Sequence, residues 1–347
     1  MKLNYHTYDL PLRHVFTISR GSSRSQPTFI VQLSEQGEYG YGEATTNSYY
    51  NASADQMAAA VERVRPLIEQ SSARDPETIL AKLGHELTGE SFPLSALDEA
   101  VHDLWGKLER KPVYELWGLT NDTVPKSDYT IGIDTIDKMV AKLEEMPDWP
   151  VYKIKLGTDR DLEIVRALRE HTDAPFRVDA NCGWTVEQTV EFSATLADLG
   201  VEFIEQPLPA DDHEGARRAY EGSALPLIAD ESCIGESDVA RCQEEFHGIN
   251  IKLVKCGGLA PARRMINDAR QRGLKVMAGC MTESTVGISA LAQLLPMLDY
   301  VDMDGAVLLA EDIATGVRVE RGVCHYANQN GTGALLLDGP LPINSPG

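Results

Sequence analysis

Eight short segments rich in β-forming residues recur along residues 129–304 at a nearly constant interval. Their starting positions lie 22, 25, 25, 25, 23, 25 and 26 residues apart, and most of the gaps carry a helical pattern, such as residues 185–199 before Gly200. A strand–helix unit repeated at this interval favours a parallel β/α barrel. A doubly wound open sheet is the alternative, but no phosphate-binding glycine fingerprint follows the early segments. The segments are 129–133, 151–156, 176–181, 201–206, 226–231, 249–254, 274–279 and 300–304.

The first 122 residues have a different pattern, which is typical of a small α+β domain. Residues 27–34 and 38–43 are rich in β-forming side chains and flank Gln36-Gly37, which predicts a hairpin. In residues 94–110, leucine and valine recur at three- and four-residue steps, which predicts an amphipathic helix. The polar stretch 120–128 is the expected linker. We therefore expect an α+β domain at 1–122, a barrel at 123–322, and a segment at 323–347 that returns to the first domain.

The net charge limits the classes of partner. The chain has 32 basic and 53 acidic residues, a formal charge of −21, so nucleic acid and anionic membranes are not expected to bind. No stretch reaches the ~18 apolar residues of a membrane span, and the first ten residues lack the apolar run of a signal peptide. The six cysteines form no C-x-x-C pair, which predicts reduced thiols in a cytoplasmic protein. Cys182 and Cys280 follow strand ends, which places them close to the expected active site, and we assign them to packing.

Acidic side chains stand near the ends of three consecutive segments of the expected barrel. Asp179, Glu205 and Asp230 lie 26 and 25 residues apart, which matches the repeat. Because active sites of such barrels lie at the C-terminal strand ends, we expect these carboxylates to converge. Three oxygen ligands suit Mg²⁺. For any one acid alone, an ordinary strand-end residue or helix cap is the alternative, and the shared spacing favours the metal site.

Lysines face this acidic cluster from two sides of the expected barrel. Lys153 and Lys155 lie two apart on one strand and point to the same side. Lys252 lies across the barrel, and Lys255 would point away from Lys252 on a regular strand. Two lysines flanking a metal-bound carboxylate suit proton transfer at the neighbouring carbon, because the metal stabilises the enediolate and a nearby cation lowers a lysine's pKa. A structural salt-bridge cluster is the alternative. No histidine lies at a predicted strand end, so a histidine base is not indicated.

The motifs K-x-K, VDAN, EQP, ADES and NIKLxKxGG, in this order, resemble the muconate-lactonising subgroup of the enolase superfamily. The similarity covers almost the whole chain. It implies an α/β fold, a (β/α)7β TIM-like barrel with an N-terminal α+β capping domain, and bound Mg²⁺. It also implies roles for six side chains: Asp179, Glu205 and Asp230 as metal ligands, Lys155 and Lys252 as the acid/base pair, and Lys153 as an auxiliary cation.

Within that subgroup, further motifs resemble the dipeptide epimerases. Asp302-Met-Asp304 resembles their D-x-D motif, which meets the free α-ammonium of the substrate, and MAGCMTES on the preceding strand also fits. The polar stretch SRGSSRS resembles their mobile specificity loop, in which Arg24, or Arg20 in a competing register, would meet a side-chain carboxylate.

The resemblance thus implies an isomerase that epimerises an Ala-Glu-like dipeptide at the α-carbon of its C-terminal residue. The reaction would be a two-base 1,1-proton transfer through an enediolate, with peptidoglycan peptide metabolism as the setting. o-Succinylbenzoate synthesis, cycloisomerisation and N-acylamino acid racemisation are the alternatives within the subgroup. A homo-oligomer is left open.

Overall fold

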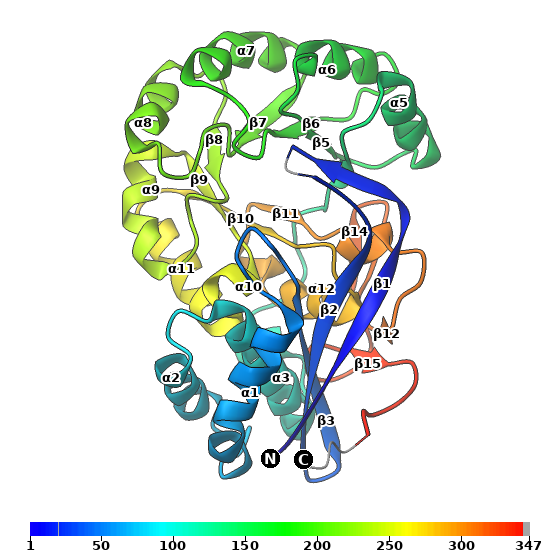
Figure 1. The fold of residues 1–347 in the computed structure, drawn as a ribbon, viewed down its shortest axis with the longest axis vertical. Coiled ribbons are helices and arrows are strands. Elements are labelled where there is room, and N and C mark those ends of the chain that lie inside the picture. Colours follow the sequence, from blue (N-terminus) through cyan, green and yellow to red (C-terminus); the bar gives the residue numbers. More distant parts are fainter. Residues whose placement is uncertain (20, 343–347) are drawn as a thin grey trace.

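The computed structural model describes residues 1–19 and 21–342. Its largest sheet has eight parallel strands, each paired with the next along the chain, and a parallel bridge between Ser127 and Val301 joins the start of the sheet to its last strand. The sheet therefore closes into a barrel (Figure 1). The strands are β4 (Tyr129–Ile131), β5 (Tyr152–Lys155), β6 (Phe176–Asp179), β7 (Val201–Glu205), β8 (Leu227–Ala229), β9 (Gly248–Ile251), β10 (Lys275–Gly279) and β11 (Tyr300–Asp302).

Helices follow the first seven of these strands and cover the outside of the barrel, as Figure 1 shows. The helices are α5 (Ile136–Glu145), α6 (Asp161–Arg169), α7 (Val186–Asp198), α8 (His213–Gly222), α9 (Val239–Glu245), α10 (Leu253–Cys256), α11 (Leu259–Gln271) and α12 (Thr285–Ala292). The described barrel also contains three 3-10 turns: η1 (Glu236–Asp238) before α9, η2 (Leu295–Met297) between α12 and β11, and η3 (Gly305–Leu308) after β11. The order is (β/α)7β, which confirms the predicted barrel. No helix in the described ranges combines the length and apolar character needed to cross a bilayer.

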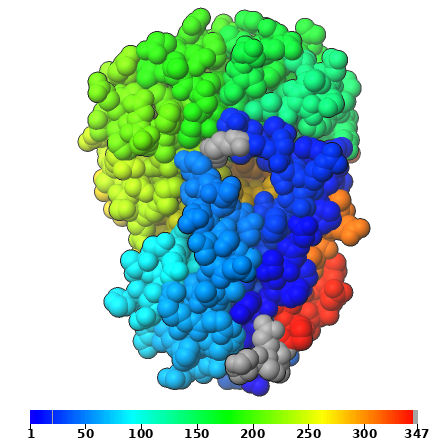
Figure 2. All heavy atoms as spheres, viewed as in Figure 1, coloured from blue at the N-terminus to red at the C-terminus, as the bar shows by residue number. Residues whose placement is uncertain are grey.

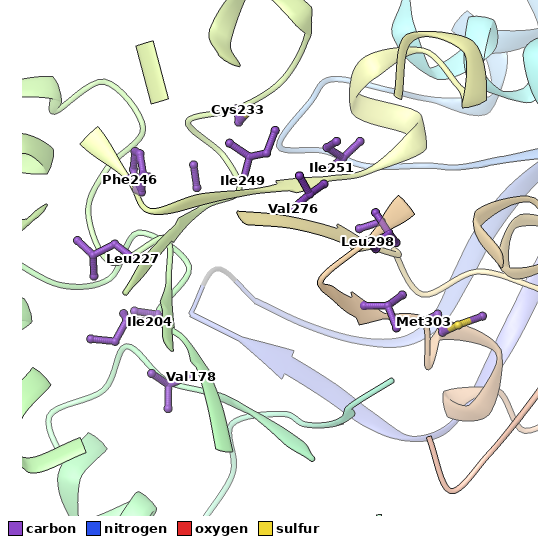
Figure 3. Close-up of a cluster of buried hydrophobic side chains, with 14 of the residues drawn as sticks. Val178, Ile204, Leu227, Cys233, Phe246, Ile249, Ile251, Val276, Leu298 and Met303 are labelled. Carbon is purple, nitrogen blue, oxygen red and sulfur yellow. The ribbon is translucent and has the colours of Figure 1, made fainter. Parts of the chain in front are cut away.

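Side chains alternate between two environments along the barrel strands. Val178 and Ile204 belong to the apolar layer shared with the outer helices (Figure 3). Because neighbouring side chains on a strand point to opposite faces, Asp179 and Glu205 point into the barrel. A second, smaller apolar cluster of Phe203, Ile228 and Met277 occupies alternate positions on the same strands. Apolar packing thus surrounds the polar residues at the C-terminal strand ends and fixes their direction.

A three-stranded antiparallel sheet and a helical layer form the N-terminal part of the molecule. Its strands are β1 (Lys2–Ile18), β2 (Gly21–Glu35) and β3 (Glu38–Thr45), and its helices are α1 (Ala54–Glu69), α2 (Pro76–Glu86), α3 (Ser91–Glu109) and α4 (Val113–Leu116). Helix α3 lies very close to β3: a Cβ added to Gly42 would lie 2.0 Å from the Ala96 carbonyl oxygen. The predicted hairpin and the predicted amphipathic helix are both present.

The β1–β2 hairpin is longer than the sequence pattern suggested. The polar stretch that we expected to be a mobile loop is largely strand, in which Thr17 pairs with Ser22 and Phe16 with Ser23. The tip is anchored to the barrel, because Ile133 N–H donates to Thr17 O at 2.9 Å and Ser19 Oγ donates to Asn181 O at 3.1 Å. The correction has a simple cause: β1 offers a pairing edge for residues whose own sequence is neutral between strand and loop.

The segment after the barrel contacts the N-terminal sheet. Strand β12 (Ala314–Thr315) pairs with β15 (Leu335–Leu336), and β13 (Arg318–Glu320) pairs with β14 (Val323–His325). Ala334 and Leu336 pack in one apolar cluster with Ile30 and Tyr41. Lys107 Nζ donates to Ala334 O at 3.0 Å, so α3 holds this segment as well.

Candidate active site

A cavity of about 560 Å³ lies at the C-terminal end of the barrel, beneath the tip of the β1–β2 hairpin. Figure 2 shows the opening as a hollow below the tip, with barrel atoms at its floor. The N-terminal part contributes apolar and hydroxyl side chains to the lining, including Phe16, Ile18, Ser23 and Tyr50. The barrel contributes most of the charged groups, including Lys155, Lys252, Asp302 and Asp304. The cavity is therefore charged on its barrel side and mostly uncharged on its cap side.

The three predicted metal ligands converge inside the barrel. Asp179 ends β6, Glu205 ends β7 directly opposite it in the ladder, and Asp230 follows β8. One carboxylate oxygen of each lies within 4.8 Å of the others, and all three side chains are almost completely buried. Burial, and next the charge of Asp179, raise the pKa of Glu205 to about 7. Three carboxylates held close together in a buried site repel one another, so the site is stabilised by positive charge beside them.

This donor set fits a divalent cation such as Mg²⁺. All of the donors are carboxylate oxygens, the ligand type that hard cations prefer. Glu205 Oε2 accepts no hydrogen bond, although Lys153 Nζ lies 2.8 Å from it as an ion pair. Asn250 Nδ2 donates to the other oxygen, Oε1, at 2.8 Å and so orients the carboxylate. Glu205 thus has a carboxylate that is oriented through Oε1 and keeps acceptor capacity on Oε2.

Lysines surround the triad from opposite sides. Lys155 Nζ donates to Asp179 Oδ2 at 2.6 Å, and Lys252 Nζ donates to Asp230 Oδ2 at 2.7 Å. Lys155 lies on β5 and Lys252 follows β9, four strands away in an eight-strand ring, so they approach from opposite walls. Burial lowers the pKa of Lys252, but the charge of Asp230 outweighs burial and raises the pKa overall. Both lysines line the cavity and could reach a bound molecule.

Lys153 lies deeper than Lys155. Its Nζ is 2.8 Å from both Glu205 and Asp302 and 3.4 Å from Asp179. Burial lowers the pKa of Lys153, but the surrounding carboxylates, Asp302 first, outweigh burial and raise the pKa well above its usual range. Lys153 is therefore a fixed positive charge that links the triad to Asp302.

Lys255 corrects our expectation for the sixth segment. Strand β9 ends at Ile251, and the chain then turns into α10, so positions 252 and 255 are three apart on a helical turn. Such positions share one side, which brings both ammonium groups to Asp230. Lys255 Nζ donates to Asp230 Oδ1 and to three carbonyl oxygens, of Asp230, Cys233 and Asn250. Its side chain is fully buried and does not line the cavity, whereas that of Lys252 does.

Asp302 and Asp304 both line the cavity, and both also have partners in the protein. Asp302 Oδ2 accepts from Lys153 at 2.8 Å, and Asp304 Oδ2 accepts from the Thr130 N–H at 2.6 Å. Burial raises the pKa of Asp302, but Lys153 outweighs burial and holds it at about 2, whereas burial and Asp302 raise the pKa of Asp304 to about 8. Asp302 Oδ1 is buried and accepts no hydrogen bond.

The predicted contact between Arg24 or Arg20 and a substrate carboxylate is not seen in the described residues. Arg24 is exposed on β2 and is not among the cavity-lining residues of the described chain, although Ser23 and Gln26 are. Arg20, the competing candidate, lies outside the described residues.

The sequence did not point to Tyr50, which lines the cavity. Burial and the charge of Asp230 raise the pKa of Tyr50. No spacing pattern pointed to Tyr50, because it lies on an irregular loop after β3.

The sequence matches two families of known protein domains. Residues 5–118 match the mandelate racemase / muconate lactonizing enzyme N-terminal domain, and residues 137–337 match the enolase C-terminal domain-like family. The chain belongs to the mandelate racemase / muconate lactonizing enzyme family of the enolase superfamily. An L-Ala-D/L-amino acid epimerase of Flavobacterium johnsoniae is 56% identical over 97% of this chain and 100% of that protein. An L-Ala-D/L-Glu epimerase of Bacteroides thetaiotaomicron is 37% identical over 97% of this chain and 88% of its own length.

Solved members of the family have the same fold. The substrate-liganded L-Ala-D/L-Glu epimerase of Bacillus subtilis superposes with a TM-score of 0.92 at 25% identity, covering 98% of this chain and 100% of its own. The dipeptide epimerase of Enterococcus faecalis, complexed with Mg and L-Leu-L-Tyr, gives a TM-score of 0.91 at 29% identity, covering 96% of this chain and 98% of its own.

Proposed function

We propose that the protein is a Mg²⁺-dependent dipeptide epimerase that inverts the α-carbon of the C-terminal residue. The observation that carries this proposal is the placement of Lys155 and Lys252 on opposite walls, with the acidic triad between them. Two relatives that are 56% and 54% identical over 97% of the chain are L-Ala-D/L-amino acid epimerases, which supports it.

Each residue of the site has a separate task in this proposal. Asp179, Glu205 and Asp230 would hold the cation. When bound, the cation supplies positive charge that makes the α-proton of a neighbouring carboxylate easier to remove. Lys155 removes this proton from one face of the α-carbon and Lys252 donates a proton to the other face; in the reverse direction they exchange roles. A lysine must be neutral to act as a base, and the charge of Lys153 acts against protonation of Lys252.

Deuterium exchange tests the two-base assignment. In D₂O, Lys155→Ala should block epimerisation but leave α-proton exchange of one stereoisomer, and Lys252→Ala should leave exchange of the other. Loss of a general base typically lowers kcat by about 10²–10⁴-fold. Lys138→Ala is the matched control, since that side chain is 67% exposed and pairs only with surface Asp134. Epimerisation that persists in either single variant of Lys155 or Lys252 would refute the assignment.

We propose that Asp302 and Asp304 hold the α-ammonium of the first residue. Asp302 Oδ1 has free acceptor capacity, and charge-assisted hydrogen bonds from an ammonium group would satisfy it. N-acetylation removes this charge, so kcat/KM for N-acetyl-Ala-Leu should fall well below that for Ala-Leu. Equal kcat/KM for the two substrates would refute the role of Asp302 and Asp304 in binding the ammonium group. It would not affect the assignment of the two lysines to proton transfer.

For the side chain of the second residue, we propose that uncharged groups are preferred and that the first residue is L-Ala. Phe16, Ile18 and Tyr50 line the cap side of the cavity, and Arg24 does not. The expectation of an Ala-Glu substrate therefore depends on Arg24 or Arg20 reaching inward on binding. Two preferences are to be distinguished: an uncharged or an acidic side chain at the second residue. The test compares rates for Ala-Leu, Ala-Gln and Ala-Glu in wild type, Arg24→Ala and Arg20→Ala. A selective loss of Ala-Glu turnover in either variant would restore the acidic preference.

We further propose a cytoplasmic enzyme that acts on peptides released from peptidoglycan. The six cysteines are free thiols, which fits a reducing compartment. Two experiments test the proposed location and pathway. Epimerase activity should co-purify with the cytosolic fraction, and deletion of the gene should cause the unepimerised dipeptide to accumulate.

A further inference from the structure

A second group of potential metal ligands lies on the amino-end side of the cavity. Cys280 follows β10, Asp302 ends β11, and Asp304 precedes η3. One ligand atom of each lies within 4.8 Å of the other two. Cys280 N–H donates to Asp302 O at 2.9 Å, so the end of the barrel ladder holds the thiol beside the carboxylate. The sequence predicted a packing role for Cys280 near the site; the side chain packs against the barrel core and also lines the cavity.

Asp302 supplies the observation that points to a ligand. Its side chain is 93% buried, and its Oδ2 is occupied by Lys153. Its Oδ1 is also buried and accepts no hydrogen bond from an N–H or a hydroxyl group in the described part of the molecule, and the neighbouring group on this side is the Asp304 carboxyl. Two carboxyl groups held against each other in a buried site are costly, and a bound cation between them removes that cost.

The surrounding geometry holds the other two donors in place. Asp304 is oriented by the Thr130 N–H, which donates to its Oδ2 at 2.6 Å. The Cys280 Sγ rests against Gly305, where an added Cβ would lie only 3.2 Å away. Neither donor therefore depends on a flexible side chain for its position.

The donor set differs from the acidic triad in chemical hardness. The triad offers only carboxylate oxygens, whereas this group adds a sulfur, which favours thiophilic ions over Mg²⁺. From this geometry we propose that Cys280, Asp302 and Asp304 form a binding site for a thiophilic divalent cation of the Zn²⁺ or Cd²⁺ class. The site is separate from the triad and selective against Mg²⁺.

Occupancy of this site would inhibit the enzyme. This consequence rests on the proposed function, in which the same two carboxylates receive the substrate's ammonium group. A cation held there excludes the amino end of the dipeptide, so Zn²⁺ should raise the apparent KM with little change in kcat. Mg²⁺ in excess should not relieve the inhibition, because Mg²⁺ competes only at the triad.

Cd²⁺ provides a readout that does not depend on activity. A thiolate bound to Cd²⁺ gives a charge-transfer band in the ultraviolet, so the Mg²⁺-loaded enzyme should gain this band with one equivalent of Cd²⁺. Cys280→Ser should abolish the band produced by this equivalent of Cd²⁺. It should also weaken Zn²⁺ inhibition at least 10-fold, measured against the variant's own rate with Mg²⁺ and without Zn²⁺. Cys324→Ser is the matched control, because Cys324 lies on β14 and does not line the cavity. It should keep both the band and the inhibition.

Two results would overturn the proposal. The first is a Cd²⁺ band of equal size in Cys280→Ser, which would place the ion on another thiol. The second is inhibition that disappears as Mg²⁺ is raised, which would place Zn²⁺ in the triad. Neither result would contradict the epimerase assignment, which the deuterium-exchange experiment tests separately.

Discussion

At the scale of single residues, Asp230 shows how two neighbouring lysines acquire different tasks. Lys255 saturates Asp230 Oδ1 and three carbonyl oxygens from a fully buried position. Lys252 contacts only Oδ2 and borders the cavity. The first lysine fixes the carboxylate, and the second is free to turn toward a substrate.

This difference predicts opposite phenotypes for the two lysines. Lys255→Met should lower the free energy of unfolding by about 3–5 kcal/mol, because it removes the donor to Asp230 Oδ1 and a charged donor to three buried carbonyl oxygens. Lys252→Met should lower it much less, since Lys255 still neutralises Asp230, but should abolish epimerisation. Urea denaturation and isotope exchange measure the two effects. Equal destabilisation by both substitutions would contradict the division of tasks.

The sequence predicted most of the residues that meet at the site, because strand spacing places side chains at one barrel end. It did not predict the side on which Lys255 lies. That position depends on where β9 stops pairing and α10 begins, which is decided by tertiary contacts and not by local propensity. The same holds for Arg24: the alternation of β2 is visible only once its pairing with β1 is known.

At the scale of elements, the packing of α3 on β3 leaves no room for a side chain at Gly42. A Cβ there would lie 2.0 Å from Ala96 O and 2.7 Å from Ala100 N. Gly42→Ala should therefore force the helix away from the sheet and lower the free energy of unfolding by more than ~2 kcal/mol. Gly84→Ala is the control, since nothing lies within 4 Å of its added Cβ on α2. The control should gain about 0.5–1 kcal/mol from helix propensity. A neutral Gly42→Ala, measured by urea denaturation, would refute the close approach.

Helix α3 also carries an acid whose ionisation opposes folding. Glu99 is buried and accepts from the Glu43 N–H at 3.0 Å and Ser95 Oγ at 2.9 Å, but burial raises its pKa well above the usual range. The unfolded chain releases this proton at a lower pH than the folded protein. Stability from Glu99 is therefore complete in acid and is lost as the pH rises through the raised pKa.

In Glu99→Gln the amide oxygen accepts from the Glu43 N–H, the amide NH2 donates to Ser95 Oγ in a reversed hydrogen bond, and the charge is removed. Relative to wild type, this variant should become progressively more stable as the pH rises from about 4, the ordinary range of a carboxyl pKa, toward neutral, since only the wild type loses stability there. Denaturation curves of both proteins across this range measure the difference. A difference that stays constant with pH would show that Glu99 does not titrate in this window.

At the scale of the whole molecule, the nearly constant interval of 22–26 residues is the strongest predictor of the fold, because a closed parallel barrel repeats a strand–helix unit seven times before its eighth strand. The joining of the barrel to the N-terminal sheet could not be read from the interval. It depends on contacts between distant segments, such as the hairpin tip on Asn181 and Glu43 on the first turn of α12.

Binding of Mg²⁺ should stabilise the whole molecule, because the triad is assembled only in the folded barrel. At a concentration of about 100 times Kd, the gain in free energy of unfolding should be ~2.7 kcal/mol. Glu205→Gln should lose most of this gain. NaCl at matched ionic strength is the necessary control, since screening also stabilises a protein with a net charge of −21. An equal gain from NaCl would mean that Mg²⁺ acts by screening alone.

The return of residues 314–341 to the N-terminal sheet has a consequence for synthesis on the ribosome. Ile30 and Tyr41 emerge early, but Ala334 and Leu336, which cover them, are translated roughly 300 residues later. The other members of this cluster, Val286, Ala314 and Leu341, also come late in the chain, so the newly made sheet exposes this apolar surface until residues 286–341 are made. Nascent chains of this protein are therefore expected to occupy chaperones during elongation, and the first domain to complete its folding last.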